Sequence, residues 1–179
     1  MQEAIIQKSL EIFKPLMKKV GAELKAKFLS NDFKVSEKAK QDVVTTADKL
    51  SETYILKAIK EYFPEHHILS EESGELENGS SSPYLWVVDP IDGTKNFVYH
   101  NPFFAISISL FYQKEVILGL IYNPILDEMY IAKKGGGAWC NGQALRVSNE
   151  QYLENLKLTY CYGSEKKNRM DALKLHCYF

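Results

Sequence analysis

WVVDPIDGTKNF, at residues 86–97, is the stretch that most strongly constrains the fold. Its apolar start predicts a short buried strand that runs directly into Asp89 and Asp92. Pro90 fixes its own φ angle and keeps the preceding residue extended, so the strand is expected to end in a rigid corner. Gly93 then allows the backbone to turn closely.

This corner has the donor set of a site for divalent metal and phosphate. Hard cations such as Mg²⁺ prefer oxygen ligands, which Asp89, Asp92 and the Ile91 carbonyl supply. Thr94 adds a hydroxyl, and a helix beginning at this point would offer free amides to a phosphate. One acidic corner is too small to hold two metals, so a second source of carboxylates is expected.

Glu71 and Glu72 are the best candidates for that second source. They follow a short apolar run, and neighbouring strand ends bring such groups together. Asp48 is a further acidic candidate, because it falls in the first turn of a helix whose N-cap is expected to be Thr45 or Thr46.

Each feature also has an ordinary structural interpretation. Asp92 followed by Gly93 is a common turn, and the acidic pair, with Glu75 and Glu77 after it, is typical of a solvated loop. Asp48 is favoured at a helix start by the helix dipole alone. The histidines lack the spacing of zinc ligands, and the sequence contains no Walker-type loop or nucleophile-elbow serine.

Composition is typical of a globular protein. The chain has 179 residues, of which 45% are hydrophobic and 25% charged, with a net charge of −1. No block of lysine and arginine marks a nucleic-acid or membrane surface, so neither partner is expected. We find no signal peptide and no apolar run near the ~18 residues that a membrane span needs. Three widely spaced cysteines argue against a disulfide framework, so we expect a cytoplasmic protein.

The remaining sequence predicts an α+β architecture with helices layered on an antiparallel sheet. One amphipathic helix is expected over residues 4–28, where Pro15 should kink the helix or mark its true start. A second should run from Thr45 or Thr46 to Phe63. Apolar or alternating runs predict strands at residues 67–69, 84–88, 105–111, 116–122, 129–132, 138–140 and 144–147.

The chain is expected to divide near residue 150. Residues 1–150 form an N-terminal α+β domain that binds metal and phosphate. Residues 151–179 begin a C-terminal α/β domain that is incomplete in this chain, with a strand expected over residues 155–162 and an amphipathic segment over residues 170–179.

Four motifs in sequence order resemble the inositol monophosphatase family of Mg²⁺-dependent, lithium-sensitive phosphatases. They are VTTAD at residues 44–48, EES at 71–73, WVVDPIDGTKNF at 86–97 and GAWCNG at 137–142. The resemblance implies the sugar-phosphatase-like αβαβα sandwich, with its second half incomplete here. It also implies a homodimer that hydrolyses a small-molecule phosphate monoester with two or three Mg²⁺ ions.

The resemblance implies roles for individual residues. The metal ligands would be Glu71, Asp89, the Ile91 carbonyl and Asp92. The substrate phosphate would lie among Glu71, Ile91, Asp92, Gly93 and Thr94, with the Gly93 and Thr94 amides as donors. Thr94 and Asp48 would position the attacking water, and Glu72 would support the site from outside the ligand shell. The reaction would be in-line attack of a metal-activated water, without a covalent phosphoenzyme.

One departure from the family pattern leaves alternatives open. The family has a later Trp-Asp motif that completes the second metal site. Here no Trp follows Trp139, and the only Asp after Asp127 is Asp171. The chain is therefore expected to be a fragment or a truncated product. The alternatives are a 3′(2′),5′-bisphosphate nucleotidase, a fructose-1,6-bisphosphatase, a histidinol-phosphatase relative, or a truncated interaction module without activity.

Overall fold

A computed structural model describes residues 2–39, 42–76 and 80–155 of the chain. Its helices are α1 (Gln2–Ser30), α2 (Thr46–Tyr62) and α3 (Thr94–Val98), with a short 3₁₀ helix at Leu153–Asn155. A small sheet pairs β1 (Val35–Ala39) with β2 (Asp42–Thr45). The strands of the large sheet are β3 (His67–Ser70), β4 (Gly74–Leu76), β5 (Tyr84–Asp92), β6 (Ala105–Tyr112), β7 (Glu115–Asn123), β8 (Glu128–Lys133), β9 (Gly137–Cys140) and β10 (Gln143–Leu145).

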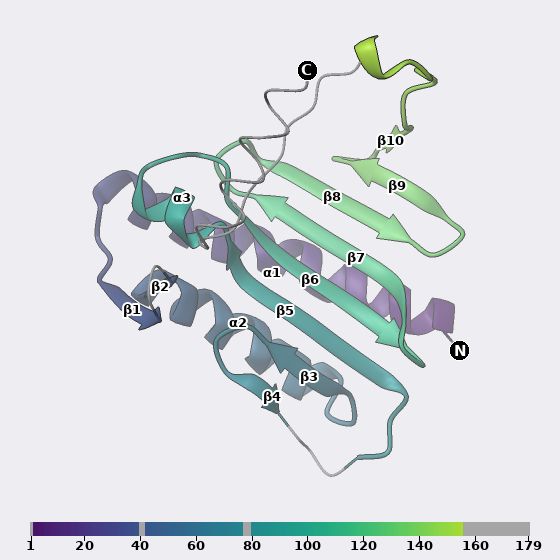
Figure 1. The fold of residues 1–179 in the computed structure, drawn as a ribbon. Coiled ribbons are helices and arrows are strands. Elements are labelled where there is room, and N and C mark those ends of the chain that lie inside the picture. The colour runs from purple at the N-terminus through teal and green to yellow at the C-terminus, as the bar shows by residue number, and fades with distance from the viewer. Residues whose placement is uncertain (1, 40–41, 77–79, 156–179) are drawn as a thin grey trace.

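The large sheet is mixed, with the strand order β10-β9-β8-β7-β6-β5-β3-β4 (Figure 1). From β5 to β10 it is the antiparallel meander that the sequence predicts. One pair departs from the antiparallel pattern, because β3 and β5 run parallel with Ser70 opposite Val88. The chain passes through β4 before it enters β5, so it enters β5 from the same end as β3.

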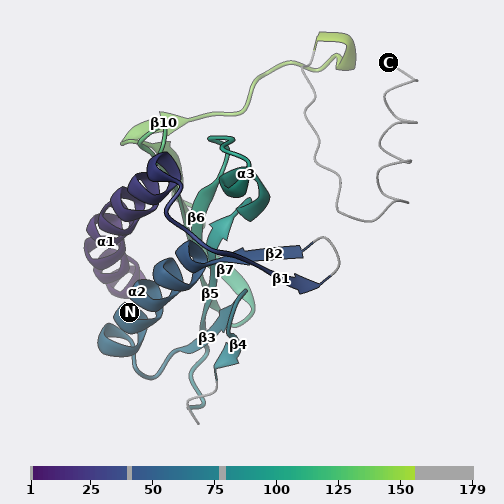
Figure 2. The same cartoon turned by 90° about the vertical axis from the view of Figure 1, so that its left-hand side faces the viewer.

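Both long helices cover the same face of the large sheet (Figure 2). The buried positions of α1 recur at helical spacing and include Phe13, Met17, Val20 and Leu24. Phe13 reaches the sheet at Trp86 of β5, where the two ring centroids lie 4.8 Å apart. The helix runs through Pro15, which is exposed, so that residue does not mark its start.

A glycine sets the contact between α1 and β7. A Cβ added at Gly21 would lie 2.4 Å from the Cε1 atom of Tyr122 and 3.0 Å from Pro124. Tyr122 is 5% exposed, and its hydroxyl donates to Asp127 Oδ1 at 2.8 Å. The backbone of α1 can therefore approach the sheet closely only because residue 21 has no side chain.

The N-terminus of α2 has the cap that its sequence predicts. Thr45 is the N-cap residue, and its hydroxyl accepts from the backbone amides of Ala47 and Asp48. Asp48 completes a capping box by accepting from the Thr45 amide at 2.8 Å. Together these bonds fix both the start of α2 and the orientation of the Asp48 carboxylate.

The predicted strand and amphipathic segment at the C-terminus fall mainly on residues 156–179, outside the described part of the chain. The division into domains near residue 150 therefore stays a prediction. Among the described residues, no helix has both the length and the apolar character needed to cross a membrane.

Candidate active site

The predicted acidic residues meet where the parallel strands β3 and β5 end. Ser70 lies opposite Val88, and the amide of Glu71 donates to the Val88 carbonyl at 3.0 Å. This register places Glu71 beside Asp89. Figure 1 shows β3 alongside β5, with α3 following the end of β5. A parallel pair therefore brings the two acidic motifs to one edge of the sheet.

The corner predicted at residues 89–92 is an irregularity in the strand. Asp89 pairs with Ser107 and Asp92 with Ala105, and the register shifts between them. Pro90 and Ile91 are buried inside this irregularity, whereas Asp92 is exposed. The strand is longer than predicted, because the chain rejoins β6 at Asp92 after the corner.

Asp89 has the most perturbed carboxyl group of the site. Burial, followed by the hydrogen bond and charge of Glu71 and the charge of Asp92, raises its pKa to about 8. Its Oδ1 atom is buried and has no hydrogen-bond partner among the described residues. The Asp89 carboxyl is therefore largely protonated at neutral pH.

These residues fit a divalent cation by their chemistry. The buried Asp89 Oδ1 lacks a partner, and a cluster of acidic oxygens requires either protons or a positive ion. Within the described ranges, no group of three Asp, Glu, His or Cys side chains is arranged so that it could hold a metal ion.

Asp48 and Thr94 lie next to this corner and contact each other. The Thr94 hydroxyl lies 3.0 Å from Asp48 Oδ1 and 3.0 Å from the Ile91 carbonyl. Asp48 Oδ2 accepts from the Thr45 hydroxyl at 2.5 Å. Burial raises the pKa of Asp48, and the hydrogen bonds from Thr45 and Thr94 oppose that effect. Asp48 therefore links the start of α2 to the start of α3.

Gly93 occupies the left-handed backbone region that the turn requires, with φ of +89°. A Cβ at this position would lie 3.0 Å from the Phe103 carbonyl oxygen, so the close approach also excludes a side chain. The same carbonyl accepts from Asn96 Nδ2 at 2.6 Å. Thr94 begins α3, where the first amides of a helix have no intrahelical acceptor.

Two residues of α2 that touch this site were not predicted from the sequence. Ser51 donates to the Pro90 carbonyl at 2.8 Å, and Glu52 accepts three hydrogen bonds from Ser70 and Ser73. Both residues lie one helical turn after Asp48, so the helical period was the available signal. Glu72, predicted as outer support, is partly buried in the turn after β3.

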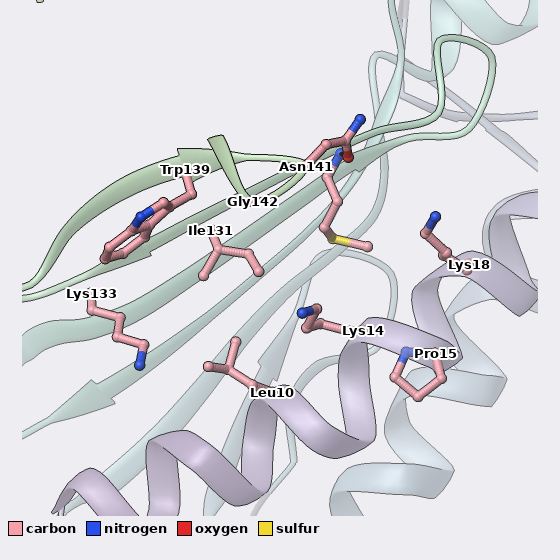
Figure 3. Close-up of a pocket in the computed structure, with 10 residues that line it drawn as sticks. Leu10, Lys14, Pro15, Lys18, Ile131, Lys133, Trp139, Asn141 and Gly142 are labelled. Atoms are coloured by element: carbon pink, nitrogen blue, oxygen red, sulfur yellow. Dashed lines mark hydrogen bonds between the residues drawn. The ribbon is translucent and has the colours of Figure 1, made fainter. Parts of the chain in front are cut away.

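A separate cavity of about 570 Å³ lies between α1 and the strands β8 and β9, away from the acidic corner (Figure 3). Leu10, Ile131 and Trp139 line its apolar part. Two of its three lysines are paired, Lys18 with Asp127 at 3.3 Å and Lys133 with Glu3 at 3.5 Å. None of the residues that line this cavity carries a carboxylate, so the cavity is separate from the predicted metal site.

Comparison with known proteins shows which family the chain resembles. The model of the inositol monophosphatase family matches residues 6–179. Inositol monophosphatase of Dictyostelium discoideum is 33% identical over 171 residues, which cover 94% of this chain and 62% of the relative.

Solved structures show the same likeness. The extragenic suppressor protein suhB of Bartonella henselae aligns with a TM-score of 0.77 and 36% identity, covering 82% of this chain and 57% of the other. Staphylococcal inositol monophosphatase-1, solved as a LiCl-soaked inhibitory complex, aligns with a TM-score of 0.70 and 27% identity over 83% of this chain and 56% of its own. The chain spans about half the length of the curated relatives it matches.

Proposed function

The chain belongs to the inositol monophosphatase family, and from this premise we propose that the protein is a Mg²⁺-dependent phosphate monoester hydrolase. The proposed substrate is an inositol monophosphate. The observation that carries the proposal is the acidic corner, where burial, and after it Glu71 and Asp92, raise the pKa of Asp89. Acidic groups held close together at a strand end are unfavourable unless a proton or a divalent cation lies between them.

Glu71, Asp89 and the Ile91 carbonyl would hold one ion, and Asp89 and Asp92 would share a second. Asp89 takes part in both sets, which agrees with the effect of both Glu71 and Asp92 on its pKa. When bound, the metal ions lower the pKa of water and neutralise charge on the leaving oxygen of the substrate. Glu72, from the same turn as Glu71, would support the ligands from outside.

The Asp48–Thr94 pair would orient the attacking water. The Thr94 hydroxyl has one proton and lies 3.0 Å from Asp48 Oδ1. If that proton is donated to Asp48, the lone pairs of the hydroxyl are directed elsewhere and can accept a hydrogen bond from water. The capping box holds Asp48 in place, so a helix cap would also serve as a positioning device for the reaction.

The turn at Gly93 would receive the phosphate. Its positive φ and the close Phe103 carbonyl keep this backbone free of side chains. The amides of Gly93 and Thr94 would donate to the substrate phosphate, beside the carboxylates that hold the metals. This arrangement suits in-line attack, because the phosphate would lie between the oriented water and the departing alcohol.

Other properties of the complete protein belong to the same proposal. A cytoplasmic location is supported by the cysteine pattern of the sequence, and a homodimer by the family resemblance. Lithium sensitivity is supported by the LiCl-soaked inhibitory complex of the staphylococcal relative.

Phosphate release tests the proposed activity. The protein is assayed on inositol monophosphate, adenosine 3′,5′-bisphosphate, fructose 1,6-bisphosphate and histidinol phosphate, with Mg²⁺ and with added Li⁺. We expect Mg²⁺-dependent release that Asp92→Asn lowers by more than about 100-fold, beyond the loss typical of outer-shell residues.

The matched control for that substitution is Asp127→Asn, which alters an exposed carboxylate paired with Lys18. It should leave turnover unchanged. Normal Mg²⁺-dependent turnover by Asp92→Asn would refute the proposed mechanism. Release from another member of the panel instead of inositol monophosphate would correct the substrate and keep the mechanism.

A further inference from the structure

Glu52 is a buried carboxylate that the proposed reaction does not use. It lies on α2 and is 7% exposed. A buried carboxylate is costly unless its oxygens are satisfied by donors. Here Oε1 accepts from the Ser70 hydroxyl at 2.5 Å and from the Ser73 amide at 3.0 Å, and Oε2 accepts from the Ser73 hydroxyl at 2.8 Å.

These three bonds span the turn that carries Glu71 and Glu72. Ser70 is the last residue of β3, and Ser73 directly precedes Gly74, the first residue of β4. Ser70 and Gly74 are paired across the two strands. Glu52 therefore binds the turn at both of its ends, from an element distant in the sequence.

The turn needs such an anchor if Glu71 is to remain beside Asp89. Glu71 is exposed, and both Asp89 and Asp92 are acidic. Glu71 lies in the turn between β3 and β4, so the position of its carboxylate depends on how that turn is held. An anchored turn keeps the carboxylate where a cation can bridge it to Asp89.

The same helix face reaches the rest of the corner. Asp48 contacts Thr94, and Ser51 donates to the Pro90 carbonyl. Glu52 follows Asp48 by four residues, so all three side chains lie on one side of α2. One rigid element thus sets the relative positions of the turn after β3, the corner in β5 and the start of α3.

We propose that Glu52 is a positioning residue for the metal site, acting through Ser70 and Ser73 to hold Glu71 against Asp89. This inference rests on the proposed function, because it assumes that Glu71 and Asp89 bind a divalent cation. It assigns Glu52 a role in metal affinity and none in contact with metal or substrate.

Mn²⁺ binding to the protein, followed by the electron paramagnetic resonance signal of the free ion, tests this role without substrate. Glu52→Met removes all three acceptor interactions at similar volume, and we expect Mn²⁺ affinity to fall by about 10- to 100-fold. In Glu52→Gln the amide oxygen still accepts twice and the amide nitrogen donates to the Ser73 hydroxyl. That variant should remain within about threefold of the wild type, since all three bonds are retained.

Two further variants keep the test decisive. Ser73→Ala removes one bond from an exposed position, and we expect a loss of about three- to tenfold even if Glu52→Met fails to fold. Glu61→Gln changes an exposed carboxylate of the same helix and should bind Mn²⁺ as the wild type does. Thermal unfolding of each variant confirms that affinities are compared between folded proteins.

The outcomes separate this inference from the proposed function. Wild-type Mn²⁺ affinity in folded Ser73→Ala and Glu52→Met, with weak binding by Asp89→Asn, would overturn the role of Glu52 and leave the metal site standing. Unchanged affinity in Asp89→Asn would show that the corner is not the metal site, and both proposals would fail.

Discussion

Burial shifts the pKa values of Asp89 and His66 in opposite directions, because it disfavours the charged form of each side chain. The pKa of Asp89 is raised to about 8, so its carboxyl tends to be neutral at neutral pH. The pKa of His66 is lowered to about 4, first by burial and then by Lys8 and His67. His66 therefore stays an uncharged imidazole, and its Nδ1 accepts from Trp86 Nε1 at 3.1 Å.

The lowered pKa of His66 predicts that the protein loses stability in acid. Because its folded pKa lies below the unfolded value of 6.5, the unfolded chain binds more protons between those values. This contribution to the free energy of unfolding should be constant above pH 6.5. It should then fall by about 3 kcal/mol as the pH drops toward 4.

The measurement is urea unfolding of wild type and His66→Asn between pH 4 and 7.5. The asparagine leaves an oxygen for the Trp86 indole but does not titrate in this range. The difference in stability between the two proteins should shrink as the pH falls, while the effect of Asp89 is common to both. A pH-independent difference would contradict the assigned pKa.

The sequence predicted those site residues whose interaction partners lie close to them in the chain. Thr45 and Asp48 were predicted at the helix start, where the capping box requires only adjacent backbone. Gly93 was predicted as a close turn and has the positive φ expected of one. Glu52 was missed because its partners, Ser70 and Ser73, are distant in sequence and are brought to α2 only by folding.

At the scale of elements, hydrophobic periodicity predicted the two long helices and most strands of the large sheet. It could not give the direction of β3 relative to β5, because that depends on the path of the chain through β4. The β1–β2 hairpin was also missed, since its sequence is short and largely polar. The proposed metal site depends on the parallel pair, which no local pattern indicates.

The contact between α1 and β7 predicts an unusual effect of alanine at Gly21. In a helix interior alanine is normally favoured over glycine by about 1 kcal/mol. Here the added Cβ would lie 2.4 Å from the ring of Tyr122, and overpacking of this kind costs about 1–3 kcal/mol. We expect Gly21→Ala to destabilise the protein by about 1–2 kcal/mol in urea unfolding.

A second background tests the physical reason for that loss. Once Tyr122→Ala removes the ring, the same Gly21→Ala substitution should cost much less, because helix propensity then opposes only the 3.0 Å approach to Pro124. If Gly21→Ala destabilises both backgrounds equally, the contact with Tyr122 is not the cause.

At the scale of the whole molecule, the residues of the proposed site come from several elements. The turn after β3 supplies Glu71, β5 supplies Asp89 and Asp92, α2 supplies Asp48 and α3 supplies Thr94. Asp48 comes from α2, which lies with α1 on one face of the sheet (Figure 2). Metal binding should therefore be linked to the protonation of the carboxyl groups that the fold forces together.

Calorimetric titration of Mg²⁺ into the protein at pH 7, in two buffers of different ionisation enthalpy, measures that linkage most directly. Because the pKa of Asp89 is about 8, the first bound Mg²⁺ should release about one proton. The release should fall toward zero at pH 9 and should be lost in Asp89→Asn. Mg²⁺ binding without proton release at pH 7, or with equal release from Asp89→Asn, would contradict a metal site at this acidic corner.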